Sequence, residues 1–208
     1  MFIHITWHEF EDYGRIPSNG LLIVKDGQAI MVDTPMDNEK TESLTTYIEE
    51  NFHVKVVKLI ASHYHDDCIG GLSYLQEKGV ESIANSMTID KCKELGLPAP
   101  AVGFTKLLNI DFNGEKIECR FFGGGHTSDN IVVWLPQQQI LFGGCMIKSA
   151  DAVNLGNIAD AVLDEWGDSI QQIQAQYKNI AVVVPGHGSS GGTELLNHTL
   201  ELLKTSEY

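Results

Sequence analysis

The segment Val54-Lys55-Val56-Val57-Lys58-Leu59-Ile60-Ala61-Ser62-His63-Tyr64-His65-Asp66-Asp67 decides the fold. Residues 54–61 are almost continuously apolar, which is typical of a strand buried on both faces of a sheet. The strand runs directly into His63, His65 and Asp67. Because residues two apart in an extended segment point the same way, His63 and His65 can bind one metal ion while Asp67 reaches a neighbouring one. Taken alone, the pattern is equally that of a polar loop with solvated histidines.

The order of apolar strand, polar loop and helix occurs in both halves of the chain. In the first half, the predicted elements are a hairpin (21–24 and 29–32), helices over 41–52, through Leu72 and over 88–95, and the strand at 54–61. In the second half, they are strands at 106–110, 116–122, 131–135, 140–142 and 180–184, and helices at 163–177 and 194–204. Two such halves predict an α/β (α+β) protein with two sheets face to face and helices outside. We expect one domain, residues 1–208, with halves of about 1–105 and 106–208.

The charge and hydropathy of the chain exclude several classes of function. It has 14 Lys and Arg against 28 Asp and Glu, for a formal net charge of −14 at pH 7. Such a chain repels phosphate backbones and anionic membrane surfaces, so neither nucleic acid nor a membrane is an expected partner. No stretch approaches the ~20 apolar residues of a membrane-spanning helix. Residues 1–6 lack the features of a signal peptide, and we expect the chain to begin inside a strand.

Three more metal-binding side chains follow apolar strands: His126, Cys145 and His187. Glycines flank each of them and let the backbone approach a ligand closely. Thiolate, imidazole and carboxylate together are typical zinc ligands. Six ligands exceed the four of a structural zinc, and they divide into two sites of three with a coordination place left for solvent. The residues therefore predict two Zn²⁺ per chain and hydrolysis by zinc-activated water.

Longer motifs surround these ligands: Pro17-Ser18-Asn19-Gly20, Val32-Asp33-Thr34-Pro35, Gly124-Gly125-His126-Thr127 and Leu141-Phe142-Gly143-Gly144-Cys145. Together they resemble the class B metallo-β-lactamases, in the di-zinc subclass with His-His-His and Asp-Cys-His ligands. The stretch Asp67-Cys68-Ile69-Gly70-Gly71-Leu72 is most similar to the enzymes of gut anaerobes. The resemblance implies a four-layer αββα metallo-β-lactamase sandwich. It also implies a first zinc on His63, His65 and His126, and a second on Asp67, Cys145 and His187.

The resemblance further implies the activity. The chain is expected to be a β-lactam amide hydrolase that uses a zinc-bound hydroxide on carbapenems, penicillins and cephalosporins, and so confers antibiotic resistance. Asp67 would orient the hydroxide, Asn157 would lie near the lactam carbonyl, and Lys148 would pair with the substrate carboxylate. Family members are usually periplasmic, and their signal peptide and first strand are absent from this chain. We expect a monomer whose small-molecule partners are β-lactam antibiotics.

Other predicted site residues lie around the ligands. Residues 7–15 match a flexible flap that closes over substrate, with Tyr13 near its tip, and Asp33 and Cys68 are expected behind the metal ligands. Two alternatives stay open: another metallo-hydrolase of this fold acting on thioesters or lactones, and a non-enzymatic zinc-binding protein. The combination of Cys145, Lys148 and Asn157 argues against the first, and the open coordination places argue against the second.

Overall fold

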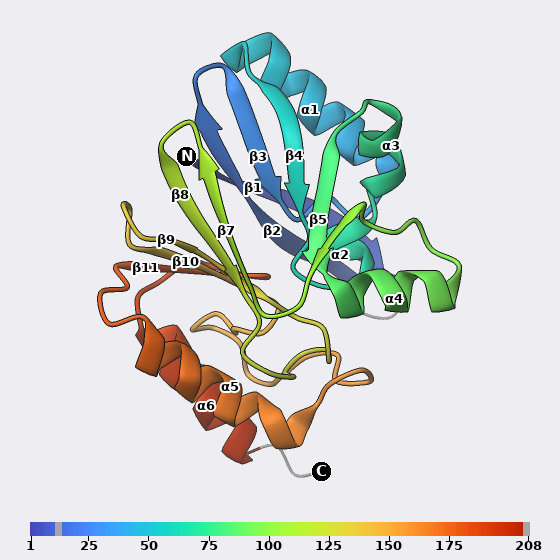
Figure 1. Ribbon diagram of the computed structural model, residues 1–208. Coiled ribbons are helices and arrows are strands. Elements are labelled where there is room, and N and C mark those ends of the chain that lie inside the picture. Colours follow the sequence, from blue (N-terminus) through green and yellow to red (C-terminus); the bar gives the residue numbers. More distant parts are fainter. Residues whose placement is uncertain (11–13, 206–208) are drawn as a thin grey trace. The chain divides into compact units, whose positions relative to one another are not determined.

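The computed structural model describes residues 1–10 and 14–205, arranged in two units (Figure 1). The first unit consists of Met1–Thr105 and Phe112–Glu115, and the second of Lys106–Asp111 and Lys116–Tyr208. Each unit contains one β-sheet with helices packed on it, as the repeated order of elements predicts. The expectation that both units form one domain stays a prediction.

Within the described residues, the first sheet has six strands in the order β1 (Phe2–Phe10), β2 (Gly14–Lys25), β3 (Gln28–Val32), β4 (Lys55–Ile60), β5 (Glu81–Asn85) and β6 (Val102–Phe104). β1, β2 and β3 are antiparallel neighbours, whereas β3 to β6 are parallel. The predicted hairpin is confirmed: Lys25 pairs with Gln28 across Asp26 and Gly27, whose φ angles are 49° and 74°. A two-residue turn with positive φ at both positions matches the twist of the strands that it joins.

Helices of the first unit are α1 (Asn38–Phe52), α2 (Asp66–Ile69), α3 (Leu72–Glu77) and α4 (Ser86–Leu95). Asp37 caps α1 by accepting a hydrogen bond from the Lys40 backbone N–H at 2.7 Å. Ile48 of α1 and Leu72 and Leu75 of α3 pack in one buried cluster with side chains of β2, β3 and β4. These helices therefore cover one face of the first sheet and leave the loop after β4 at its edge.

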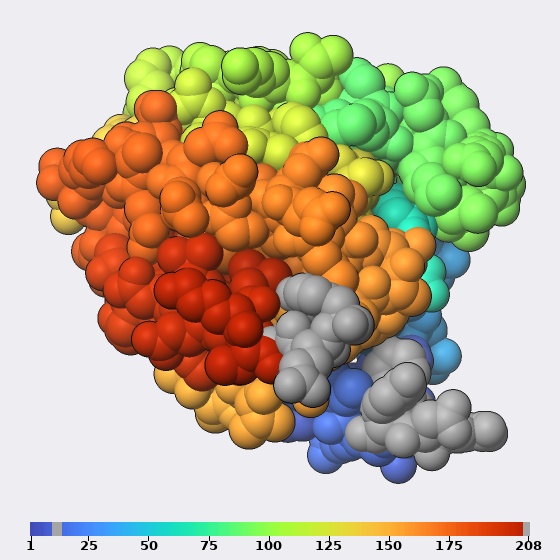
Figure 2. Space-filling model, turned by 90° about the horizontal axis from the view of Figure 1, so that it is seen from below, coloured from blue at the N-terminus to red at the C-terminus, as the bar shows by residue number. Residues whose placement is uncertain are grey.

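Within the described residues, the second sheet has the order β11 (Val182–Pro185), β10 (Ile140–Gly144), β9 (Val132–Leu135), β8 (Glu115–Arg120) and β7 (Leu107–Phe112). β10 runs parallel to β11 and antiparallel to β9. Two helices, α5 (Leu163–Gln176) and α6 (Glu194–Thr205), cover one face of this sheet and share a buried cluster with its strands. Figure 2 shows the outer surfaces of α5 in orange and α6 in red beside each other.

Two features of the fold bear on the site. Because β10 and β11 are parallel neighbours, their carboxyl ends meet at one edge, which brings the segments holding Cys145 and His187 together. Across the described residues, no helix is both long enough and apolar enough to cross a membrane.

Candidate metal centre

The first unit places three predicted ligands at the end of β4. His63 and His65 lie in the loop between β4 and α2, with ring centroids 4.7 Å apart. Asp67 stands in the first turn of α2, and its Oδ1 is 3.6 Å from His63 Nε2. His63 is 1% exposed, so its imidazole is held among protein atoms rather than solvated. The geometry within this unit excludes the simple interpretation as a solvated polar loop.

A buried hydrogen-bonded group lies behind His63. Asp33 Oδ1 accepts from the Ser62 backbone N–H at 2.6 Å, and Asp33 Oδ2 accepts from the Ser62 hydroxyl at 2.7 Å. Ser62 Oγ is 3.2 Å from His63 Nδ1, and Cys68 Sγ is 3.1 Å from the same nitrogen. Asp33 and Cys68 therefore lie where the sequence predicts them. Ser62, which joins them, is not predicted from the sequence.

Asp33 is unusual in conformation and in ionisation. Its φ of 59° lies in the left-handed region, which Asp tolerates better than most residues. Burial raises the pKa of Asp33 to about 7, although the nearby His63 and the hydrogen bonds from Ser62 act in the opposite direction. Without metal, this carboxyl group is thus only partly ionised at neutral pH.

The second unit brings Cys145 and His187 into direct contact at the ends of β10 and β11. Cys145 Sγ lies 3.3 Å from His187 Nε2. The adjacent backbones are joined by the Gly186 N–H, which donates to the Gly144 carbonyl at 2.7 Å. A Cβ at Gly186 would lie 2.4 Å from the sulfur, so only glycine permits this approach.

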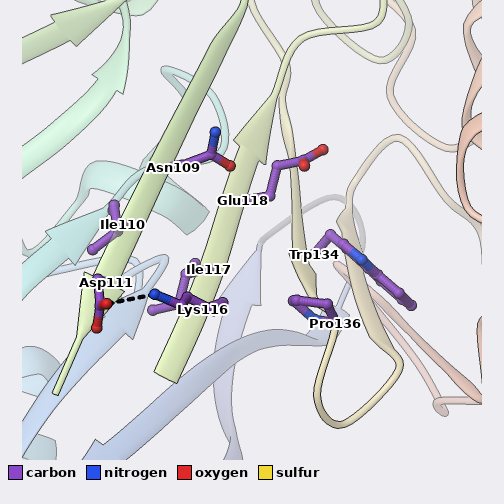
Figure 3. A pocket seen from close by; sticks show the side chains of 8 residues that line it. All are labelled: Asn109, Ile110, Asp111, Lys116, Ile117, Glu118, Trp134 and Pro136. Carbon is purple, nitrogen blue, oxygen red and sulfur yellow. Dashed lines mark hydrogen bonds and ion pairs between the residues drawn. The ribbon is translucent and has the colours of Figure 1, made fainter. Parts of the chain in front are cut away.

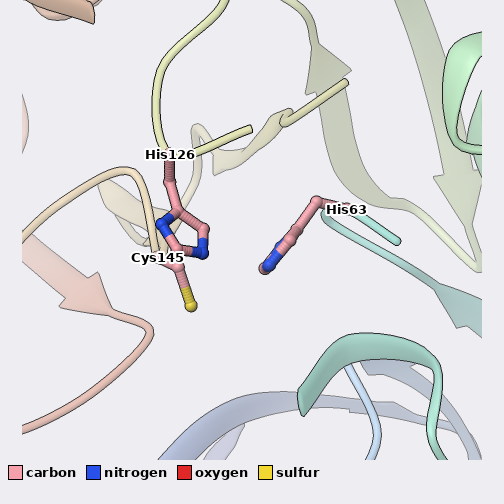
Figure 4. Close-up of side chains that lie close together, drawn as sticks. All are labelled: His63, His126 and Cys145. Atoms are coloured by element: carbon pink, nitrogen blue, oxygen red, sulfur yellow. The ribbon is translucent and has the colours of Figure 1, made fainter. Parts of the chain in front are cut away.

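His126 of the same unit lies near this pair. Its ring nitrogen and Cys145 Sγ are within 4.8 Å of each other, and Figure 4 shows the two side chains emerging from different loops. A thiolate and two imidazoles at these separations form a set of ligand types suited to zinc. The second unit therefore gathers its three predicted ligands around one space.

Helix α5 holds the loop that carries His126. Glu165 accepts a hydrogen bond from the Gly124 backbone N–H at 2.8 Å, and the Ser169 hydroxyl donates to the Gly124 carbonyl at 2.8 Å. Asn130 closes the loop from within, since its Oδ1 accepts from the Thr127 N–H at 3.0 Å and its Nδ2 donates to the Gly123 carbonyl at 3.2 Å. Neither Glu165 nor Ser169 is predicted from the sequence, because both look like ordinary polar residues of a helix.

The residues predicted to bind substrate have different settings. Lys148 is only 9% exposed, and its ammonium lies 5.4 Å from the centroid of the Trp166 ring. Asn157 is exposed in a loop, where its Oδ1 accepts from the Ala159 N–H at 3.1 Å. Tyr13 lies outside the described residues. The predicted flap corresponds to the β1–β2 hairpin, in which the Arg15 guanidinium is 4.6 Å from the Trp7 ring centroid.

A separate pocket of about 340 Å³ lies over β7, β8 and β9 (Figure 3). Its charged groups are paired within the protein: Lys116 with Asp111, and Glu118 with Arg120 and the Tyr177 hydroxyl. None of the predicted metal ligands lines this pocket. The metal-binding side chains, rather than this hollow, are the candidate functional site.

Comparison with known proteins identifies close relatives. The sequence pattern of the metallo-beta-lactamase superfamily matches residues 13–187. A metallo-beta-lactamase type 2 from Bacteroides fragilis is 46% identical over 203 residues, which covers 98% of this chain and 82% of that protein. The solved structure of a metallo-beta-lactamase from Pontibacter korlensis has a TM-score of 0.94 and 40% identity, covering 98% of this chain and 94% of that one.

A further solved structure is described as DIM-1 metallo-beta-lactamase exposed to ceftazidime. It has a TM-score of 0.93 and 34% identity, and the match covers 98% of this chain and 92% of that chain. Likeness of this extent confirms both the family resemblance and the fold class predicted from the sequence.

Proposed function

Since the chain belongs to the metallo-beta-lactamase superfamily, we propose that it is a zinc-dependent hydrolase that opens the amide bond of β-lactam antibiotics and so confers resistance to them. The observation that carries this proposal is the pair formed by Cys145 and His187, 3.3 Å apart at adjacent strand ends, in a chain of this family. A structural pair of this kind would have no need of the open edge on which it lies.

The donors fit zinc. Bond lengths of about 2.3 Å to sulfur and about 2.0 Å to nitrogen place two tetrahedral ligand atoms roughly 3.5 Å apart, close to the observed 3.3 Å. We propose that His63, His65 and His126 hold one Zn²⁺ and that Asp67, Cys145 and His187 hold a second. Family membership and the gathering of three ligands within each unit support this division.

Bound zinc supplies Lewis acidity, which ionises water near neutral pH and polarises a carbonyl group. The protein's own groups do the rest. Asp67 orients the attacking water by accepting a hydrogen bond from it. The Asn157 amide donates to the lactam oxygen as negative charge develops there. The Lys148 ammonium pairs with the carboxylate that β-lactam drugs carry.

The proposed substrates are carbapenems, penicillins and cephalosporins, and the proposed location is the periplasm. The ceftazidime named for the DIM-1 structure is a cephalosporin, which supports this substrate class. No feature of the described residues favours a thioester or lactone substrate or a purely zinc-binding role.

The experiment that tests the function measures zinc content and hydrolysis of a chromogenic cephalosporin on one sample, with and without a chelator. We expect two zinc ions per chain, rapid hydrolysis, loss of activity with chelator and recovery on adding zinc. Hydrolysis that persists in the metal-free protein would contradict the proposal. A parallel panel with a thioester and a lactone would identify a different substrate class.

A further inference from the structure

The segment that follows β10 is held by side chains of both helices of the second unit. The Trp166 indole N–H of α5 donates to the Met146 carbonyl at 2.8 Å. From α6, Thr199 Oγ1 accepts from the Lys148 backbone N–H at 2.9 Å, and His198 Nε2 bonds to the Ala152 carbonyl at 2.8 Å. Residues 146–152 thus have three fixed points, although they form no helix or strand.

Thr199 is the fixed point closest to Lys148. It is fully buried, and its hydroxyl has a defined direction because it donates to the Leu195 carbonyl at 2.8 Å while its oxygen accepts from Lys148. Being one turn inside α6, Thr199 cannot move without the helix. The backbone of Lys148 is therefore tied to a rigid element.

We propose that Thr199 is a positioning residue for substrate: its hydroxyl fixes the backbone of Lys148, and thereby the place at which the lysine ammonium meets the substrate carboxylate. This inference rests on the proposed function, because it takes Lys148 as the group that pairs with that carboxylate. Thr199 itself does not touch substrate.

The physical reason lies in the length of the lysine side chain. A flexible four-carbon stem carries a point charge, so the position of the backbone sets which points the ammonium can reach. Lys148 is 9% exposed and its ammonium lies over Trp166, which leaves the stem little freedom to compensate for a displaced backbone. Removing the Thr199 hydroxyl leaves a buried N–H without its acceptor, and the loop must shift to find another.

The test compares Thr199→Val, which keeps the shape and removes the hydroxyl, with Thr199→Ser, which keeps the hydroxyl. A misplacement near 1 Å can cost up to about 100-fold. We expect Thr199→Val to raise KM for a chromogenic cephalosporin at least about fivefold, with little change in kcat, since the lost contact binds ground state and transition state alike. Thr199→Ser should restore KM. Against the methyl ester of the same cephalosporin, Thr199→Val should behave like the unchanged protein.

Controls separate positioning from folding. Thr205→Val removes a hydroxyl of the same helix that donates only to the Glu201 and Leu202 carbonyls, and it should leave KM unchanged. Zinc content is measured for every variant. Thr199→Ala, smaller than valine, provides a second hydroxyl-free variant should the valine variant not fold.

The outcomes are distinct. An unchanged KM in Thr199→Val and Thr199→Ala, an equal rise for acid and ester, or a loss of zinc would each overturn the inference. In the unchanged protein, hydrogen exchange offers a test without substitution: the Lys148 amide should exchange slowly, and fast exchange would contradict the bond to Thr199. Failure of the unchanged protein to hydrolyse either cephalosporin would instead refute the proposed function.

Discussion

Replacing Gly186 with alanine should displace the Cys145 thiol. The added Cβ would lie 2.4 Å from Cys145 Sγ, 2.6 Å from its backbone N and 2.9 Å from its Cα. Ordinary carbon contacts are about 3.5–4.0 Å, so the overlap with sulfur exceeds roughly 1 Å. The backbone cannot yield easily, because Gly186 N–H donates to the Gly144 carbonyl. We expect destabilisation of about 1–3 kcal/mol from overpacking.

The larger effect should be on metal binding. A thiol displaced by about 1 Å no longer lies 3.3 Å from His187 Nε2, and errors of this size can cost about 100-fold in rate. The assay combines zinc content, the thiolate-to-metal absorption band of the cobalt-substituted protein, and kcat/KM for a cephalosporin. Gly167→Ala is the matched control: its Cβ would meet only Leu200 at 3.9 Å, and alanine in the middle of α5 should stabilise by up to about 1 kcal/mol. Full zinc content and activity in Gly186→Ala would refute the reasoning.

Three further substitutions follow from the structure. Cys145→Ser should lower zinc content and reduce kcat/KM at least about 100-fold, since it removes the thiolate beside His187; retention of both would show that Cys145 is not a ligand. Asn130→Ala should cost about 1–3 kcal/mol in urea unfolding, because it removes both hydrogen bonds that close the His126 loop. His4→Gln tests a pH effect: burial lowers the pKa of His4 to about 4, below its unfolded value near 6.5, so the unfolded state binds more protons and stability falls as pH drops from about 6.5 to 4. This loss, up to about 3 kcal/mol, should be absent from His4→Gln in urea unfolding at a series of pH values, and parallel profiles would contradict it.

The positions of the metal ligands were predictable from sequence because each follows an apolar strand and has metal-binding chemistry of its own. β4, β10 and β11 end where the sequence predicts, and Cys145 and His187 meet because β10 and β11 are parallel. Periodicity is least informative where buried positions are polar. β5 was not predicted, since Ser82 and Asn85 interrupt its apolar pattern. Their polar groups are satisfied by bonds to Ala101 and Met87, which only the folded chain reveals.

The residues that hold the ligands were much less predictable than the ligands. Ser62, Glu165 and Thr199 each act through one hydrogen bond to a loop distant in sequence, and nothing near them in the chain announces that partner. Serine beside a histidine is as ordinary in sequence as glutamate or threonine on a helix. Their function depends on tertiary contact, so local patterns carry no signal for it.

Within the second unit, these contacts couple the loops that carry ligands. Glu165 and Ser169 hold the loop of His126, while Trp166 of the same helix holds the Met146 carbonyl, next to Cys145. A small displacement of α5 therefore carries both loops in the same direction and preserves the separation of His126 from Cys145. Substitution of Glu165 alone releases one loop and changes that separation. The ligand geometry is consequently more sensitive to the loss of one anchoring side chain than to motion of the helix that bears them all.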